Sequence, residues 1–333
     1  MEVFAHASTQ MVIMFLMMGA GILARKVGIL DDHVDSALSK LVMNFALPAM
    51  IIGAVLNSSE LPDVQTVLLI LLVSTLSLGG TAIATDLFSQ LYRKSTNSQR
   101  GAHAFVMMFG NVGFIGLPVL SAIFGQEALL YAAIFNIPFN FLMFTVGPAE
   151  IKRGSGEPRD GNSENGSPVA IGMGHGSFKG KLYRTLKSLV NPCLAACVAA
   201  PILVVLGVTD NGGIVGNFCD SLGQLVTPGS MIVVGSNLAK MSVRDMVSHG
   251  NVYVTSFVRL VAVPVLVFLV FRNFLSDPML MGVLVVGSAM PAASMGTIFS
   301  VLYGGSTETM MRCTFVSTIL SIFTIPLITL LIA

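Results

Sequence analysis

The chain has 333 residues, of which 54% are hydrophobic and only 11% are charged, and its formal net charge is +1. A soluble domain carries roughly a quarter charged residues, and one water-soluble core of this size could not bury so much apolar surface. The composition excludes an ordinary soluble protein, and the small net charge gives no reason to expect nucleic acid as a partner.

Apolar runs of about twenty residues recur along nearly the whole chain, which is the length a helix needs to cross a hydrocarbon layer of roughly 30 Å. The runs are continuously apolar rather than alternating, so helices are favoured over the strands of a membrane barrel. The first run follows Glu2 rather than a basic leader, so we expect a span and not a cleaved signal. We predict an all-α integral membrane protein with ten spans. They lie near residues 5–24, 34–56, 64–91, 101–124, 127–149, 183–208, 213–239, 250–271, 278–302 and 307–332.

One long polar stretch, residues 151–181, separates the fifth and sixth predicted spans. It is rich in glycine, serine and charge, which predicts a flexible linker. With the amino terminus outside, fifteen of the eighteen lysines and arginines fall on the cytoplasmic side, as the positive-inside rule requires. We therefore expect a multi-pass protein of the plasma membrane, with both termini outside and the linker in the cytoplasm.

The linker divides the spans into two sets of five, in residues 1–150 and 182–333. Because five is odd, the second set must enter the membrane from the opposite side. Two similar sets would then form an inverted repeat, as in many secondary transporters. Pro48 and Pro228 are each followed shortly by a Met-Ile run, which supports such a repeat, although a match this short can also arise by chance.

Two of the predicted spans contain residues that interrupt a helix. The fourth contains GNVGFIGLP, from Gly110 to Pro118, and the ninth contains GSAMPAASMG, from Gly287 to Gly296. In a helix interior Gly costs about 1 kcal/mol and Pro about 3 kcal/mol relative to Ala. A break in hydrocarbon persists only where it is packed in protein or lines a polar cavity. Interrupted helices in matching positions predict a binding site near the middle of the membrane, although single Gly and Pro residues also occur as simple kinks.

The cargo expected at these breaks is a small organic anion. The amino-terminal ends of half-helices present free N–H groups and a positive dipole end, which favour a carboxylate. On the fifth span, two asparagines share one helix face, where a helix-to-helix hydrogen bond is the competing interpretation. The candidate substrate-binding residues are Asn111, Gly113, Pro118, Asn136, Asn140, Ser288, Met290, Pro291 and Ser294.

The same segments resemble the auxin efflux carrier family. GNVGFIGLP and the following YAAIFNIPFN, from Tyr131 to Asn140, are similar to the fourth and fifth spans of that family, and Asn191-Pro192 and Met290-Pro291 also fit. The resemblance implies two inverted five-helix halves with crossed broken helices, an architecture like that of sodium/proton antiporters and bile-acid symporters. It also implies a scaffold made of the first two spans of each half and a moving unit made of the last three.

For the cargo, the resemblance implies a dicarboxylate or an auxin-like carboxylate, as carried by bacterial malate- or malonate-type permeases and plant auxin carriers. The chain lacks the long cytoplasmic loop of the larger plant carriers, which favours a permease-like member. The expected partners are the anion and the lipid bilayer, with no nucleic acid, and a homodimer is left open.

The sequence leaves the coupling ion open, because no acidic residue lies at the two breaks. Lys40 and Arg259 fall within predicted spans, where a charge indicates function unless the side chain extends to an interface. His103 could titrate near neutral pH, although a single histidine is more often incidental. A sodium-coupled organic-anion symporter of the bile-acid type, which has a similar ten-span plan, is the alternative function.

An intramembrane enzyme is a remote alternative, because the sequence shows neither a pair of catalytic carboxylates nor an HExxH motif. Cys193 and Cys197 have helical spacing but no neighbouring histidine, so we interpret them as buried thiols rather than metal ligands. We expect no catalytic residue, no metal site and no cofactor.

Overall fold

The computed structural model of the chain describes residues 2–58, 61–92, 95–155, 192–210, 213–240 and 250–332. These residues form helices and one isolated antiparallel bridge, between Gly110 and Ala292, but no sheet. The prediction of an all-α protein is confirmed for this part of the chain.

The helices of the first half follow the predicted spans closely. They are α1 (Glu2–Lys26), α2 (Asp32–Leu41), the π-helical turn η1 (Val42–Ala46), α3 (Leu47–Leu56), α4 (Val64–Ser89), α5 (Asn97–Met108), the π-helical turn η2 (Val112–Gly116), α6 (Leu117–Phe124) and α7 (Glu127–Ser155). The helix α7 extends into the stretch expected as linker, because no helix-breaking residue occurs between Pro148 and Gly154. The rest of the expected linker lies outside the described residues.

The second half, like the first, has an interrupted helical segment before its last long helix. Its elements are α9 (Pro192–Val205), α10 (Ile214–Gly223), α11 (Val226–Ala239), α13 (Gly250–Phe257), the π-helical turn η3 (Val258–Ala262), α14 (Val263–Phe271), α15 (Pro278–Ser288), α16 (Met295–Tyr303) and α17 (Thr307–Thr329). The first residues of the expected sixth span, before Pro192, lie outside the described residues.

Within the described residues, five helical segments are long and apolar enough to cross a membrane. They are Asp32–Leu56, Val64–Ser89, Glu127–Lys152, Gly250–Phe271 and Thr307–Thr329. Shorter apolar helices include Val112–Phe124, Ala195–Val205 and Pro278–Ser288. Two of these three are short because a break interrupts the helix.

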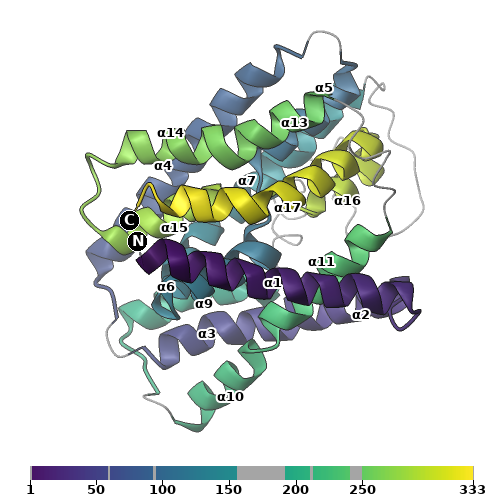
Figure 1. The fold of residues 1–333 in the computed structure, drawn as a ribbon. Helices are drawn as coiled ribbons and strands as arrows, with labels where there is room; N and C mark the ends of the chain where they lie inside the picture. Colours follow the sequence, from purple (N-terminus) through teal and green to yellow (C-terminus); the bar gives the residue numbers. More distant parts are fainter. Residues whose placement is uncertain are drawn as a thin grey trace, which may run out of the picture.

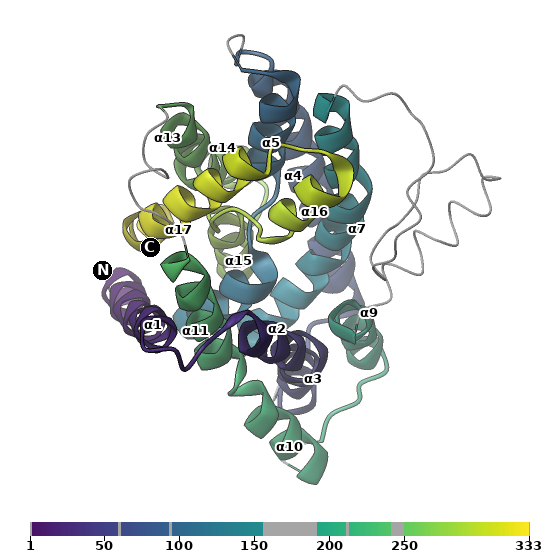
Figure 2. The ribbon, with the colours of Figure 1, turned by 90° about the vertical axis from the view of Figure 1, so that its right-hand side faces the viewer.

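The helices pack as two groups that lie side by side (Figures 1 and 2). In one group α1 runs along α11, and α3 packs against α9 and α10. In the other, α7 contacts α4 and α5, and α17 contacts α13, α15 and α16. Each group therefore combines helices from both halves of the chain.

Glycines bring α1 and α11 into close contact. A β-carbon at Gly235 of α11 would overlap the carbonyl oxygen of Met18 in α1, and one at Gly21 of α1 would overlap the carbonyl oxygen of Ile232 in α11. Small residues at helix crossings are typical of membrane proteins, where backbone proximity provides the packing energy. These two positions fix the distance between the helices.

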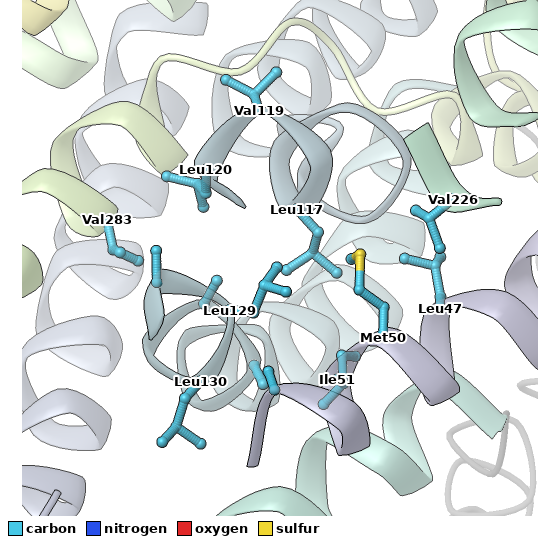
Figure 3. Close-up of a cluster of buried hydrophobic side chains, with 14 of the residues drawn as sticks. Leu47, Met50, Ile51, Leu117, Val119, Leu120, Leu129, Leu130, Val226 and Val283 are labelled. Atoms are coloured by element: carbon cyan, nitrogen blue, oxygen red, sulfur yellow. The ribbon is translucent and has the colours of Figure 1, made fainter. Parts of the chain in front are cut away.

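A large apolar cluster joins the two groups beside the break in the fourth span. Figure 3 shows side chains from α3, α6 and α7 that meet those of α11 and α15. Leu47, Ile51, Leu117, Leu120 and Leu129 are each at most 1% exposed. This packing holds the short helix α6 in place, because most of its side chains are buried against neighbouring helices.

At one end of the bundle, a buried carboxylate connects three helices. Asp35 of α2 is 4% exposed and accepts a hydrogen bond of 2.8 Å from Ser236 Oγ of α11. Lys240 Nζ lies 2.8 Å and Arg25 Nη1 3.4 Å from the same carboxylate oxygen. Asp32 contacts both cations as well, but its side chain is 80% exposed.

Replacing Asp35 with Asn should therefore lower the free energy of unfolding by about 1.5–3 kcal/mol, the value of hydrogen bonds to a charged group. Asp32→Asn is the matched control, because the same cations lose a carboxylate that water already solvates, so a much smaller change is expected. Thermal unfolding of both purified variants in detergent checks this. Equal melting temperatures for the two variants would show that Asp35 contributes no more than its exposed neighbour.

Candidate functional site

The first break separates α5 from η2 and α6. Phe109, with φ −116° and ψ 115°, leaves the helical conformation at the end of α5. Asn111 then starts the next helix, because its side-chain Oδ1 accepts a hydrogen bond of 3.2 Å from the Phe114 amide. Pro118 lies within the helical run Val112–Phe124, directly after the π-helical turn η2, in which the Leu117 amide donates to the Val112 carbonyl five residues earlier. Such a turn accommodates a residue that lacks an N–H.

The second break separates α15 from α16. The helix α15 ends at Ser288 and α16 begins at Met295, so Pro291 lies in the irregular segment between them. The amide of Ala292 within this segment donates a hydrogen bond of 3.1 Å to Ser317 Oγ of α17. A side chain of the neighbouring helix α17 thus accepts a hydrogen bond from one of the backbone amides that the break leaves without a helical partner.

The two breaks lie against each other in antiparallel fashion. The Asn111 amide donates to the Pro291 carbonyl at 2.6 Å, and the Ala293 amide donates to the Phe109 carbonyl at 3.0 Å. These bonds flank the bridge between Gly110 and Ala292, as in a short piece of antiparallel ladder. Chain segments far apart in sequence thereby form one backbone unit in the interior of the bundle.

A buried arginine binds both broken segments from the side of α4 and α14. Arg259 lies in η3 and is 3% exposed. Its Nε donates to the Met290 carbonyl at 2.9 Å, and its Nη1 donates to the Met108 and Met107 carbonyls at 3.1 and 3.3 Å. Those carbonyls lie at the carboxyl end of α5 and just beyond α15, where the breaks remove their usual helical donors.

No acidic side chain balances this arginine among the described residues, because none of their ion pairs involves Arg259. Its charge instead faces the negative ends of two half-helix dipoles. A cavity of about 10 Å³ adjoins it, room for about one water. The polar side chains that line the cavity besides Arg259 are Ser77, Thr81 and Ser288.

The opposite side of the crossing is more open. Gly113 is partly exposed, and a β-carbon added there would meet nothing within 4 Å. Ser294, at the start of α16, is exposed, and its Oγ accepts a hydrogen bond of 3.2 Å from Asn111 Nδ2. The helices η2 and α16 thus begin on the same, more exposed side of the crossing, next to one amide and one hydroxyl side chain.

A model of the membrane transport protein family matches residues 6–329. The chain belongs to this family, which is that of the auxin efflux carriers. Two relatives are uncharacterized transporters of methanogens. The one from Methanothermobacter thermautotrophicus is 27% identical over 317 residues, 92% of each chain, and the one from Methanocaldococcus jannaschii is 23% identical over 320 residues, 95% of each chain. The protein is therefore a multi-pass membrane transporter and not an enzyme, and the resemblance seen in the sequence is confirmed.

The crossing of this transporter contains several of the predicted binding residues. Asn111, Pro291 and Ser294 meet there through the hydrogen bonds described above. Met290 is fully buried and contributes its carbonyl. Ser288 donates to the Val285 carbonyl on its own helix while lining the cavity beside the arginine.

The asparagines of the fifth span are placed differently. Asn136 donates to the Ala132 carbonyl at 3.1 Å, and Asn140 donates to the Asn136 carbonyl at 2.8 Å, so both amides bond along α7. Neither amide forms a hydrogen bond to the crossing. Their role in binding stays a prediction, as does that of Pro118, which is buried in α6.

Arg259 is the main residue at the crossing that the predicted site did not include. The signal for it was an arginine in a continuously apolar run, and its burial now rules out the alternative that it extends to an interface. Lys40, the other candidate, is exposed. His103 is buried, stacks on Tyr92 with ring centroids 4.6 Å apart and bonds to Thr255 Oγ1 at 2.7 Å, so it contributes to packing.

Proposed function

We propose that this transporter moves a small organic anion across the membrane by alternating access and holds it at the crossing of the two broken segments. The observation that carries the proposal is the pairing of those segments, with the half-helix amino termini of η2 and α16 on one side of the crossing. Broken helices paired in the membrane interior are the usual binding site of secondary transporters.

The preference for an anion follows from the groups on that side of the crossing. Amino-terminal helix ends present N–H donors and a positive dipole end. Asn111 adds an amide donor and Ser294 a hydroxyl, and no carboxylate of the described residues pairs with the arginine behind them. A carboxylate of a dicarboxylate or auxin-like cargo would accept hydrogen bonds from these donors.

The proposal includes ten spans arranged as two inverted halves, residues 1–150 and 182–333, joined by a cytoplasmic linker. The helix order supports it, since the fourth helical segment of each half, α5–α6 and α15–α16, is the broken one. The start of α1 and the end of α17 lie near each other in Figures 1 and 2, as an even number of spans requires. Both termini would lie on the outer side of the plasma membrane.

The two helix groups suggest how the cargo moves. The group of α1, α3, α9, α10 and α11 contains the first two spans of each proposed half, which would form the scaffold. The other group contains the crossing and would move against the scaffold. Movement of one group past the other would expose the anion first to one side of the membrane and then to the other.

Transport by the purified protein in liposomes tests the proposal. The panel contains malate, malonate, succinate, indole-3-acetate and a bile acid, each assayed as electrical current and as radiolabel uptake. We expect at least one of these anions to move. No transport across the panel, from protein shown to be folded by its melting curve, would contradict the assignment of a carboxylate cargo.

Asn111→Ala should reduce anion transport by about tenfold, because one hydrogen bond to a charged group contributes roughly 1.5–3 kcal/mol and a tenfold change corresponds to about 1.4 kcal/mol. Its matched control is Asn44→Ala, which removes an exposed amide from η1. Uptake into liposomes and melting temperature are measured for both. Undiminished uptake by Asn111→Ala would remove this residue from the site.

A further inference from the structure

The carboxyl ends of broken membrane helices need a positive partner. A break removes the N–H donors from the last carbonyls of a half-helix, and the helix dipole makes that end negative. In transporters built on broken helices, the unwound carbonyls and half-helix carboxyl ends are where a coupling cation such as sodium binds. The group that binds these carbonyls therefore helps to determine which ion gradient, if any, drives transport.

In this protein the position is filled by a side chain. The guanidinium of Arg259 donates hydrogen bonds to the carbonyls of Met107, Met108 and Met290, so it contacts the carboxyl ends of the half-helices at both breaks. An arginine keeps its charge under almost all conditions and holds a planar set of donors in fixed geometry. It supplies both the charge and the hydrogen bonds that a bound cation would otherwise provide.

The structure leaves little room for a second cation beside it. Gly110 packs so closely against Nη2 of Arg259 that a β-carbon there would overlap it. The adjoining cavity of about 10 Å³ holds about one water molecule. A sodium ion at this place would compete for the same carbonyls and would be repelled by the guanidinium.

From this geometry we infer that Arg259 is a resident cation that takes the place of a coupling ion, so that the protein moves its anion without binding sodium at the crossing. The inference rests on the proposed function and adds the coupling mode to it. It separates the anion carrier from the sodium-coupled symporter, which the sequence left as alternatives.

The hydroxyl groups around the arginine make the inference testable. Ser77, Thr81 and Ser288 line the cavity next to the guanidinium. If Arg259 is replaced by alanine, these hydroxyls and the released carbonyls would surround an oxygen-lined space from which a positive charge has been removed. An added cation, either sodium or free guanidinium, should bind there and restore part of the lost stability.

The experiment compares melting temperatures of the purified protein in sodium chloride and in choline chloride at equal ionic strength. The proteins are the wild type, Arg259→Ala, Arg259→Lys and Arg272→Ala, the last being an exposed arginine at the end of α14. For the wild type and for Arg272→Ala, we expect the melting temperature to be the same in sodium chloride as in choline chloride. Arg259→Ala should melt lower in choline and higher again when sodium or low concentrations of guanidinium are added, with Arg259→Lys intermediate.

A wild-type melting temperature that rises with sodium would overturn the inference, because it would show an unoccupied sodium site. So would an Arg259→Ala variant that melts like the wild type, or one that is destabilised but responds to neither cation, since the arginine would then be only a packing element. If Arg259→Ala cannot be purified, the inference is tested by the melting temperatures of the wild type and of Arg259→Lys in the two salts.

These measurements need no cargo, so they distinguish failure of the inference from failure of the proposed function. A silent anion panel would contradict the proposed cargo and leave the melting comparison valid. Where the panel identifies a transported anion, its wild-type uptake rate should be equal in sodium and choline. A rate that depends on sodium would again favour the symporter.

Discussion

Gly110→Ala is expected to reduce transport by at least about tenfold and to lower thermal stability, although it adds only one methyl group. The new β-carbon would overlap Arg259 Nη2 and lie 2.9 Å from both Arg259 Cζ and the Met290 carbonyl oxygen. Overpacking of this kind typically costs about 1–3 kcal/mol. Here the arginine must also shift, which would weaken its hydrogen bonds to both breaks and alter the geometry of the site.

The control is Gly80→Ala in α4, where a β-carbon would meet nothing within 4 Å and alanine favours the helix. Uptake into liposomes and melting temperature are compared for both variants. If Gly110→Ala transports and melts like Gly80→Ala, the close packing of the arginine against the first break is not required for function.

Gly235→Val should disrupt the contact between α1 and α11 and give protein that melts lower or aggregates on purification. The β-carbon would overlap the Met18 carbonyl oxygen, which belongs to the backbone and cannot move without moving the whole helix. The adjacent close contact, Gly21 against Ile232, would be separated as well. We expect a loss of at least about 1–3 kcal/mol, the usual cost of overpacking, because two backbones must separate.

Gly79→Val is the matched control, since it introduces the same side chain into α4 at a position with open space around it. Size-exclusion profiles and melting curves in detergent measure the difference. A monodisperse Gly235→Val protein with the melting temperature of Gly79→Val would show that the close contact contributes little to stability.

The helices and their interruptions could be predicted from the sequence because both depend on local chemistry. Continuous apolar runs specify helices in hydrocarbon, and the glycines and prolines around Pro118 and Pro291 specify where those helices stop. The extension of α7 to Ser155 was missed because hydropathy indicates where the apolar part of a helix ends, whereas helix propensity decides where the helix itself ends.

The chemistry of the crossing was harder to predict because it depends on contacts between distant segments. The sequence shows that carbonyls near Met108 and Met290 lose helical donors, but not that Arg259 of another helix would bind them. The side-chain directions of Asn136 and Asn140 were equally hard to predict, and their role in binding stays a prediction. An asparagine within a helix can bond to the carbonyl one turn earlier, and both residues do so.

The antiparallel pairing of the breaks has a consequence for the direction of transport. The bonds between Phe109, Asn111, Pro291 and Ala293 and those of Arg259 all lie within one helix group. If that group moves as a unit, the site keeps the same internal geometry whichever side it faces. Its intrinsic affinity for the anion would then be equal at the two membrane surfaces. Net flow would follow the concentration gradient and the voltage, and reversing those gradients would turn an exporter into an importer.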